Sequence, residues 1–222
     1  MRKLFTLVIF SVLCGGLSAD EVFTYRMLKD KEPESKTMTV TRTDGGSTVT
    51  ESQDKGNEVR TAEIDSSWST RTFHFRNMSA GTDYRAERAG SKITVTGMRN
   101  SRALKREFSI DEEPWYQFPE QALGSLPPRA LGSAKFWLID ADQCEIHEME
   151  AVTVGTESLS LMGAPVQARK IRVNLTGFAS LFWTAHYWFG PADWPYLRYE
   201  TTEGPGGSSL VIELVSRESN HE

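Results

Sequence analysis

The sequence has almost no cysteine. Only Cys14 and Cys144 occur among 222 residues, and cleavage of a signal peptide after Ala19 would remove the first of them. One remaining cysteine cannot form an internal disulfide, so a secreted domain stapled by disulfides is excluded. The fold therefore has to be held by its own apolar core, which a chain of about 200 residues can supply.

Basic segments and long apolar runs are also scarce. The formal net charge is −5, from 25 Lys and Arg against 30 Asp and Glu, and the sequence has no basic tail. Binding to nucleic acid depends on cations that neutralise phosphates, so we expect no nucleic-acid partner. No apolar run after Asp20 approaches the length of a transmembrane helix, so we expect no transmembrane segment in the mature chain.

The first nineteen residues have the plan of a secretory signal peptide. Arg2 and Lys3 precede a short apolar run at residues 4–13, and Ala19 offers a small-residue cleavage site. We predict a signal peptide at residues 1–19 and a single β-rich domain at residues 20–222. Lipid anchoring at Cys14 is not expected, because Leu13 is not the small residue that a lipoprotein signal places before its cysteine.

Strand patterns fill the rest of the chain. Threonines alternate with Met38 and Val40 before a turn at residues 44–46, and further hairpin patterns occur at residues 84–96 and 159–175. At least ten strands at roughly even spacing predict an all-β fold, an antiparallel meander forming an open or partly closed β-barrel. Residues 111–132 carry four prolines and are interpreted as a long connection between two halves of the sheet. It has room for one short helix at most, at residues 120–126.

No motif in the sequence supplies a catalytic centre. Cys144 and His147 could share a metal ion, but the spacings of closed zinc sites and of calcium loops are missing. His186 has no nucleophile that the sequence can pair with it, and no G-x-S-x-G motif occurs. We therefore expect no catalytic residue, no metal and no cofactor.

Aromatic residues are concentrated towards the C-terminus, where residues 182–199 hold eight of the chain's 23. On strand alternation Trp183, Tyr187 and Phe189 share one face. That face either packs in the core or lines a hydrophobic cavity, and both interpretations fit the pattern. In the second case we predict that Trp183, Tyr187, Phe189 and Tyr199 bind the ligand.

The same region carries a family resemblance. Residues 187–189 (YWF), 195–200 (PYLRYE), 204–206 (GPG) and 211–214 (VIEL) resemble the DUF3108-like exported bacterial proteins of unknown function. Those proteins are similar in plan to periplasmic lipoprotein carriers of the LolA/LolB type. The resemblance implies a β half-barrel whose concave face can hold acyl chains, and a location in the bacterial periplasm. It carries no catalytic residue over to this chain.

Three functions of different classes follow from these observations. The first is non-enzymatic binding of an apolar ligand, a lipid or an acyl chain, in the half-barrel. The second is a packed structural protein that contacts a protein of the cell envelope, with Trp194 as its partner-binding residue because exposed loop tryptophans often dominate interfaces. The third is a hydrolase that uses His186 or a metal site at Cys144 and His147, and it ranks last because nothing pairs a nucleophile with a base.

Overall fold

A computed structural model describes residues 20–29, 32–43, 45–125, 133–161, 163–177, 183–190, 196–202 and 209–220. The first eight strands are β1 (Asp20–Lys29), β2 (Glu32–Thr43), β3 (Gly46–Gln53), β4 (Glu58–Asp65), β5 (Thr70–Asn77), β6 (Thr82–Ala89), β7 (Lys92–Arg99) and β8 (Arg102–Ser109). The other six are β9 (Ser133–Asp140), β10 (Glu145–Leu161), β11 (Ala164–Leu175), β12 (Thr184–Phe189), β13 (Tyr196–Thr202) and β14 (Ser209–Asn220). A 3-10 turn η1 (Asp54–Gly56) and one helix α1 (Pro119–Ser125) complete the described elements.

All the strands belong to one antiparallel sheet. Its order is β8-β7-β6-β5-β4-β3-β2-β1-β14-β13-β12-β11-β10-β9. Consecutive strands pair with each other except β8 and β9, and β1 also pairs with β14. The sheet therefore has β8 and β9 as its two edges, although these strands are consecutive in the chain. The predicted all-β antiparallel meander is confirmed, with fourteen strands where the sequence showed at least ten.

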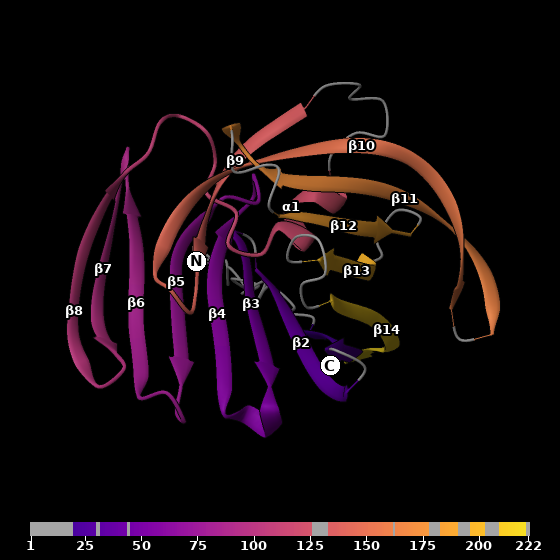
Figure 1. The fold of residues 1–222 in the computed structure, drawn as a ribbon, viewed down its shortest axis with the longest axis horizontal. Helices are drawn as coiled ribbons and strands as arrows, with labels where there is room; N and C mark the ends of the chain where they lie inside the picture. Colours follow the sequence, from indigo (N-terminus) through magenta and orange to yellow (C-terminus); the bar gives the residue numbers. More distant parts are fainter. Residues whose placement is uncertain are drawn as a thin grey trace, which may run out of the picture.

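The sheet curls so that one face is inside. In Figure 1 strands β3 to β8 run close to vertical, whereas β10 to β13 run across the view, and α1 lies between the two halves. Buried and exposed positions alternate along the strands: in β6 Tyr84 and Ala86 are buried, while Asp83 before them and Arg85 between them are exposed. The core lies on the concave face, where a period of two places the apolar side chains.

The connection between the two edge strands crosses the mouth of this curl. Residues 114–117 run beside β9, where the Tyr116 amide donates to the carbonyl of Trp137 (2.9 Å). On the other side the Thr70 amide of β5 donates to the carbonyl of Trp115 (2.7 Å). The connection therefore joins the two halves of the sheet by hydrogen bonds, and its helix at Pro119–Ser125 matches the short helix expected there within one residue at each end.

A second contact joins the edges through the turn between β9 and β10. The Tyr84 hydroxyl donates to the carbonyl of Ala141 (2.8 Å), and the Arg106 guanidinium donates to the carbonyl of Cys144 (2.7 Å). Side chains of β6 and β8 thus hold this turn, although no ladder of the described strands joins β8 to β9. The barrel is open between its edge strands.

The side chain of Gln117 bonds the crossing segment to β9. Its side-chain oxygen accepts hydrogen bonds from the Trp115 indole (2.9 Å) and the Ile139 amide (3.2 Å), and its amide group donates to the Ile139 carbonyl (2.8 Å). All of these groups are buried. Leucine has a similar volume but leaves the three partners unsatisfied, and buried unsatisfied polar groups are costly.

We predict that Gln117→Leu lowers the free energy of unfolding by about 3 kcal/mol, from the loss of buried hydrogen bonds. Urea denaturation followed by tryptophan fluorescence measures it. Gln143→Leu is the matched control, because Gln143 is exposed and its variant should change the value by less than about 0.5 kcal/mol. Equal stability of the two variants would show that the crossing segment does not hold the edges together.

Candidate ligand-binding cavity

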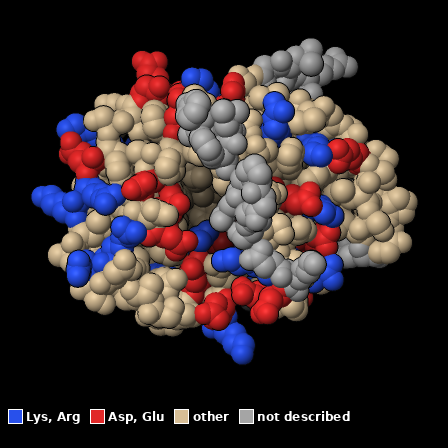
Figure 2. Space-filling model, viewed as in Figure 1, with Lys and Arg blue, Asp and Glu red and all other residues tan. Residues whose placement is uncertain are grey.

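A cavity of about 400 Å³ lies inside the curled sheet. This volume falls in the range of small-molecule sites. Its walls come from both halves of the molecule: β1 to β4 on one side, β9, β12, β13 and β14 on the other, with the start of α1 and the crossing segment between them. Figure 2 shows a hollow near the middle of the face viewed, with both basic and acidic side chains beside it.

One part of the wall is apolar and aromatic. Tyr187 is its centre, because its ring lies 4.8 Å from that of Tyr199 and 6.1 Å from that of Tyr196, measured between centroids. The apolar side chains of this wall are Met27, Trp183, Leu210 and Ile212. Trp183 is only partly buried, so its ring is available to a ligand.

The structure brings three of the four predicted ligand-binding residues to the cavity. Trp183, Tyr187 and Tyr199 line it, and their role as ligand contacts stays a prediction. Phe189 is not among the lining residues. It is buried beside α1, where the nearest ring atom lies 3.2 Å from the position that a β-carbon on Gly124 would occupy. Trp194, the predicted partner-binding residue, lies outside the described residues.

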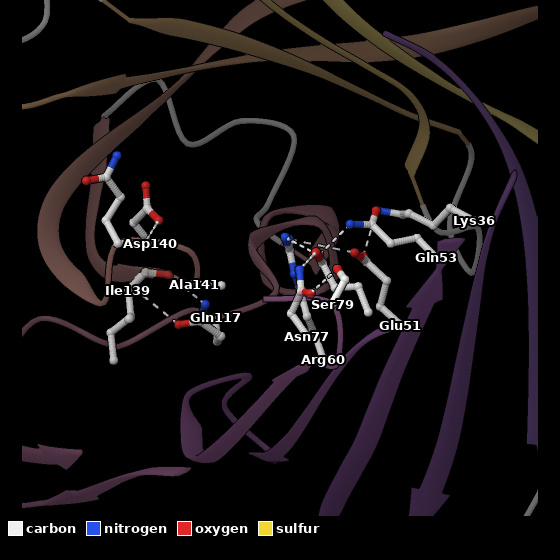
Figure 3. Close-up of polar contacts among 12 residues, drawn as sticks. Lys36, Glu51, Gln53, Arg60, Asn77, Ser79, Gln117, Ile139, Asp140 and Ala141 are labelled. Atoms are coloured by element: carbon white, nitrogen blue, oxygen red, sulfur yellow. Dashed lines mark hydrogen bonds and ion pairs between the residues drawn. The ribbon is translucent and has the colours of Figure 1, made fainter. Parts of the chain in front are cut away.

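The opposite part of the wall carries buried charges. Lys36 Nζ lies 2.6 Å from a Glu51 carboxylate oxygen, and the two side chains are 7% and 4% exposed. The Arg60 guanidinium lies 3.8 Å from Glu51 and 2.7 Å from Glu58, which also accepts a hydrogen bond from Gln53. Figure 3 shows the side chains of Lys36, Glu51 and Arg60 pointing toward one another from neighbouring strands. We refer to Lys36, Glu51, Glu58 and Arg60 as the ionic cluster.

Neighbouring charges decide how the buried acids ionise. Burial would raise the pKa of Glu51, but the positive charges of Lys36 and Arg60 outweigh it and lower that pKa below its ordinary 4.5. Glu120, in the first turn of α1, behaves in the opposite way. Burial raises its pKa to about 7, and the attraction of Lys36 is partly cancelled by repulsion from Glu51. Glu51 is therefore charged near neutral pH, while Glu120 titrates there.

A stacked tyrosine pair separates the apolar wall from the ionic cluster. The rings of Tyr25 and Tyr196 are 4.5 Å apart and nearly parallel, and Lys36 Nζ lies within 6 Å of both centroids. The Tyr25 hydroxyl donates to the backbone carbonyl of Tyr196 (3.3 Å). The Tyr196 hydroxyl is buried and has no hydrogen-bond partner among the described residues.

The ionic cluster was missed at the sequence level, although a signal for it exists. Lys36 lies on the same strand face as Met38 and Val40, the apolar positions used to predict that strand. Arg60 likewise shares a face with Ala62 and Ile64. Charged residues at inward-facing positions of a half-buried strand mark either an error of register or a functional site. Pairing of β3 with β4 then places Glu51 opposite Arg60.

The remaining candidate residues lie outside the cavity lining. Cys144 is fully buried in the core, and burial raises the pKa of its thiol despite the nearby Arg106 and Arg99. His186 lies on β12 opposite Arg172 and Glu200, where burial and Lys170 lower its pKa. In the described part of the chain no three His, Cys, Asp or Glu side chains gather as a metal site.

We predict that protonation of Glu120 stabilises the fold. The pKa of this carboxyl is about 7 in the folded protein against 4.5 when unfolded, so the folded state binds the proton more tightly. The free energy of unfolding should therefore fall by about 3 kcal/mol as the pH rises from 5 to 8. Urea denaturation across this range measures it. Glu51 should not contribute, because its lowered pKa acts only below pH 4.5.

Glu120→Gln is the control for this effect, because it keeps the shape and removes the charge. The variant should match the parent at pH 5 and exceed its stability by about 3 kcal/mol at pH 8. A parent and variant that respond to pH in parallel would contradict the assignment of Glu120 as the titrating group.

We also predict that Lys36→Met lowers the free energy of unfolding by about 3 kcal/mol, because it leaves Glu51 charged and buried with only a distant guanidinium. The double variant Lys36→Met/Glu51→Met should recover most of the loss, since it removes both charges. Thermal and urea unfolding measure both. A double variant less stable than the single one would contradict this expectation. It would show that the Lys36–Glu51 pair stabilises the fold by more than the neutralisation of one buried charge by the other.

The fold does not test where in the cell the protein is located. Residues 1–19, including Cys14, lie outside the described residues, so the predicted signal peptide and the single domain boundary stay predictions. Among the helices that the structure describes, none is long and apolar enough to cross a membrane.

Comparison with known proteins reveals a similarity of fold and no match in sequence. No family model matches it, and no curated protein matches it in sequence. A β-barrel-like protein of the DUF1849 domain of unknown function from Brucella abortus superposes with a TM-score of 0.63, at 9% identity over 93% of this chain and 99% of that one. The two chains therefore share an architecture over nearly their whole lengths.

Two further solved structures align less well. The hypothetical lipoprotein YmcC from Escherichia coli has a TM-score of 0.39, at 8% identity over 89% of this chain and 83% of that one. A domain from Vibrio parahaemolyticus, whose name proposes outer-membrane lipoprotein sorting, has a TM-score of 0.30, at 9% identity over 90% and 85% of the two chains. Likenesses at this level carry no functional argument. The resemblance to DUF3108-like proteins stays a prediction. The chain is similar to a barrel-like domain of unknown function.

Proposed function

We propose that this protein binds an apolar ligand, a lipid or an acyl chain, in the cavity of its β half-barrel and does not catalyse a reaction. The observation that carries the proposal is the cavity of about 400 Å³ with Trp183, Tyr187, Tyr199, Leu210 and Ile212 along one wall. Apolar surface facing an open cavity of this size is stabilised when a ligand displaces the water.

The burial of the aromatic residues supports a binding wall over a packed core. Tyr187 is 8% exposed and Trp183 is only partly buried, although both belong to the most aromatic part of the chain. Rings that pack only against one another are normally fully covered, as Phe73 and Phe75 are on β5. Among the described aromatic residues from 183 to 199, the three most exposed rings, those of Trp183, Tyr187 and Tyr199, line the cavity.

The chemistry of the cavity supports binding over hydrolysis. Among the described lining residues there is no serine, cysteine or histidine that could act as nucleophile or base. Lys36, Arg60 and Glu51 are engaged with one another, which leaves them poorly placed to transfer protons to a substrate.

The proposed location is the bacterial cell envelope, most specifically the periplasm. It is supported by the signal-peptide plan of residues 1–19 and by the resemblance to DUF3108-like exported proteins. The alternative function is that of a structural protein that binds a partner through Trp194. It is supported by the sequence alone, because Trp194 lies outside the described residues.

Trp183→Ala should weaken ligand binding about tenfold or more, because it removes a large partly buried ring from the wall. Displacement of the neutral fluorophore N-phenyl-1-naphthylamine by a palmitoyl lipid measures it. The change in stability should be small, since Trp183 lies just before β12 and is not fully buried.

Trp137→Ala is the matched control, because Trp137 is also partly buried but its indole donates to Asp111 outside the cavity lining. Its variant should bind as the parent does. If Trp183→Ala binds as tightly as the parent, or if both variants lose affinity equally, the cavity is not the site.

A further inference from the structure

The cavity contains a buried hydrogen-bonding group with no partner. Tyr196 is 1% exposed and lines the cavity, and its hydroxyl makes no hydrogen bond with the described residues. A buried hydroxyl without a partner is uncommon and costs free energy. Its pKa is raised far above the ordinary value by burial and by the charges of Glu120 and Glu51, so it is a protonated donor that lies among the cavity's polar groups.

The charges around the cavity are already balanced. Lys36 is paired with Glu51, and Arg60 lies against Glu51 and Glu58. These pairs balance the charge of both cations, although the Arg60 Nε–H makes no hydrogen bond with the described residues, and Glu120 adds a further carboxyl beside them. At the rim the exposed Lys29 is accompanied by Asp140 and Asp142. The lining as a whole therefore offers no net positive field to an anionic head group.

We propose that the ligand is an uncharged amphiphile whose ester or amide carbonyl accepts a hydrogen bond from the Tyr196 hydroxyl, with its chain on the apolar wall. This inference rests on the proposed function and adds the chemical class of the head group. A neutral carbonyl satisfies the free donor and adds no charge to a cluster that is already paired.

The two charged alternatives fit less well. A carboxylate or phosphate would enter beside Glu51 and Glu120, whose repulsion opposes the attraction of Lys36 and Arg60, and both cations are already in ion pairs. A quaternary ammonium head would face Lys36 and Arg60 and has no lone pair to accept the hydroxyl proton. The neutral carbonyl satisfies the Tyr196 hydroxyl, one of four buried side-chain polar atoms without a partner among the described residues, and adds no charge to the cavity.

Four ligands with one chain length test the class of head group. The mature protein is titrated at pH 8 with monopalmitoylglycerol, palmitamide, palmitate and hexadecyltrimethylammonium, each displacing N-phenyl-1-naphthylamine. The ester and the amide should bind at least about tenfold more tightly than either ion. Palmitate or the ammonium compound binding as tightly as the ester would overturn the inference.

A pair of conservative variants then tests the contact itself. Tyr196→Phe removes the free hydroxyl and should weaken binding of the ester and the amide roughly fivefold, while binding of palmitate stays unchanged. Tyr25→Phe is the control in the same stacked pair, because its hydroxyl is already bonded to the Tyr196 carbonyl. Tyr25→Phe should lower the unfolding temperature without changing which ligand head group the protein prefers. Equal losses for all four ligands with Tyr196→Phe would overturn the proposed hydrogen bond.

The outcomes separate this inference from the proposed function. If none of the four ligands displaces the fluorophore, the proposed function itself fails. If palmitate binds best and Lys29→Gln removes its advantage, the function stands, but the head group lies at the rim and the inference is wrong.

Discussion

The structure depends on how one long sheet covers its own inner face. Fourteen antiparallel strands form a single meander, and the only helix that the described chain sets against it has seven residues. The sheet must therefore curl until its two halves face each other. The crossing segment and the turn between β9 and β10 then hold the edges, through Gln117, Tyr84 and Arg106. The halves do not meet everywhere, and a cavity of about 400 Å³ remains between them.

The two ends of that cavity have opposite chemistry. The C-terminal strands contribute aromatic and aliphatic side chains, whereas β2, β3 and β4 contribute Lys36, Glu51 and Arg60 at inward positions. Such a pair of buried ions is weak evidence for stability, because the desolvation of both groups offsets their attraction. Their placement beside an apolar wall fits the proposed ligand, which has an apolar chain and a polar head.

Alternation and turn chemistry predicted the fold well. The hairpins around residues 44–46 and 163, the short helix near 120 and the long connection all follow from local patterns, because consecutive strands pair with each other except where the long connection separates β8 from β9. The site was only partly predictable. Trp183, Tyr187 and Tyr199 share a cavity, but Phe189 faces α1, a contact between distant segments that no local pattern encodes. The inward Lys36 and Arg60 were detectable by their register, whereas the unpartnered hydroxyl of Tyr196 depends on the tertiary structure alone.

The central claim is that the half-barrel holds a lipid. Native mass spectrometry of the mature protein, purified from a bacterial periplasm without detergent and followed by solvent extraction, tests it most directly. The account predicts a co-purifying uncharged amphiphile in the parent and much less of it in Trp183→Ala. A parent protein that carries only its own mass, and that stays bare when incubated with monopalmitoylglycerol, would contradict the account and favour a packed structural protein.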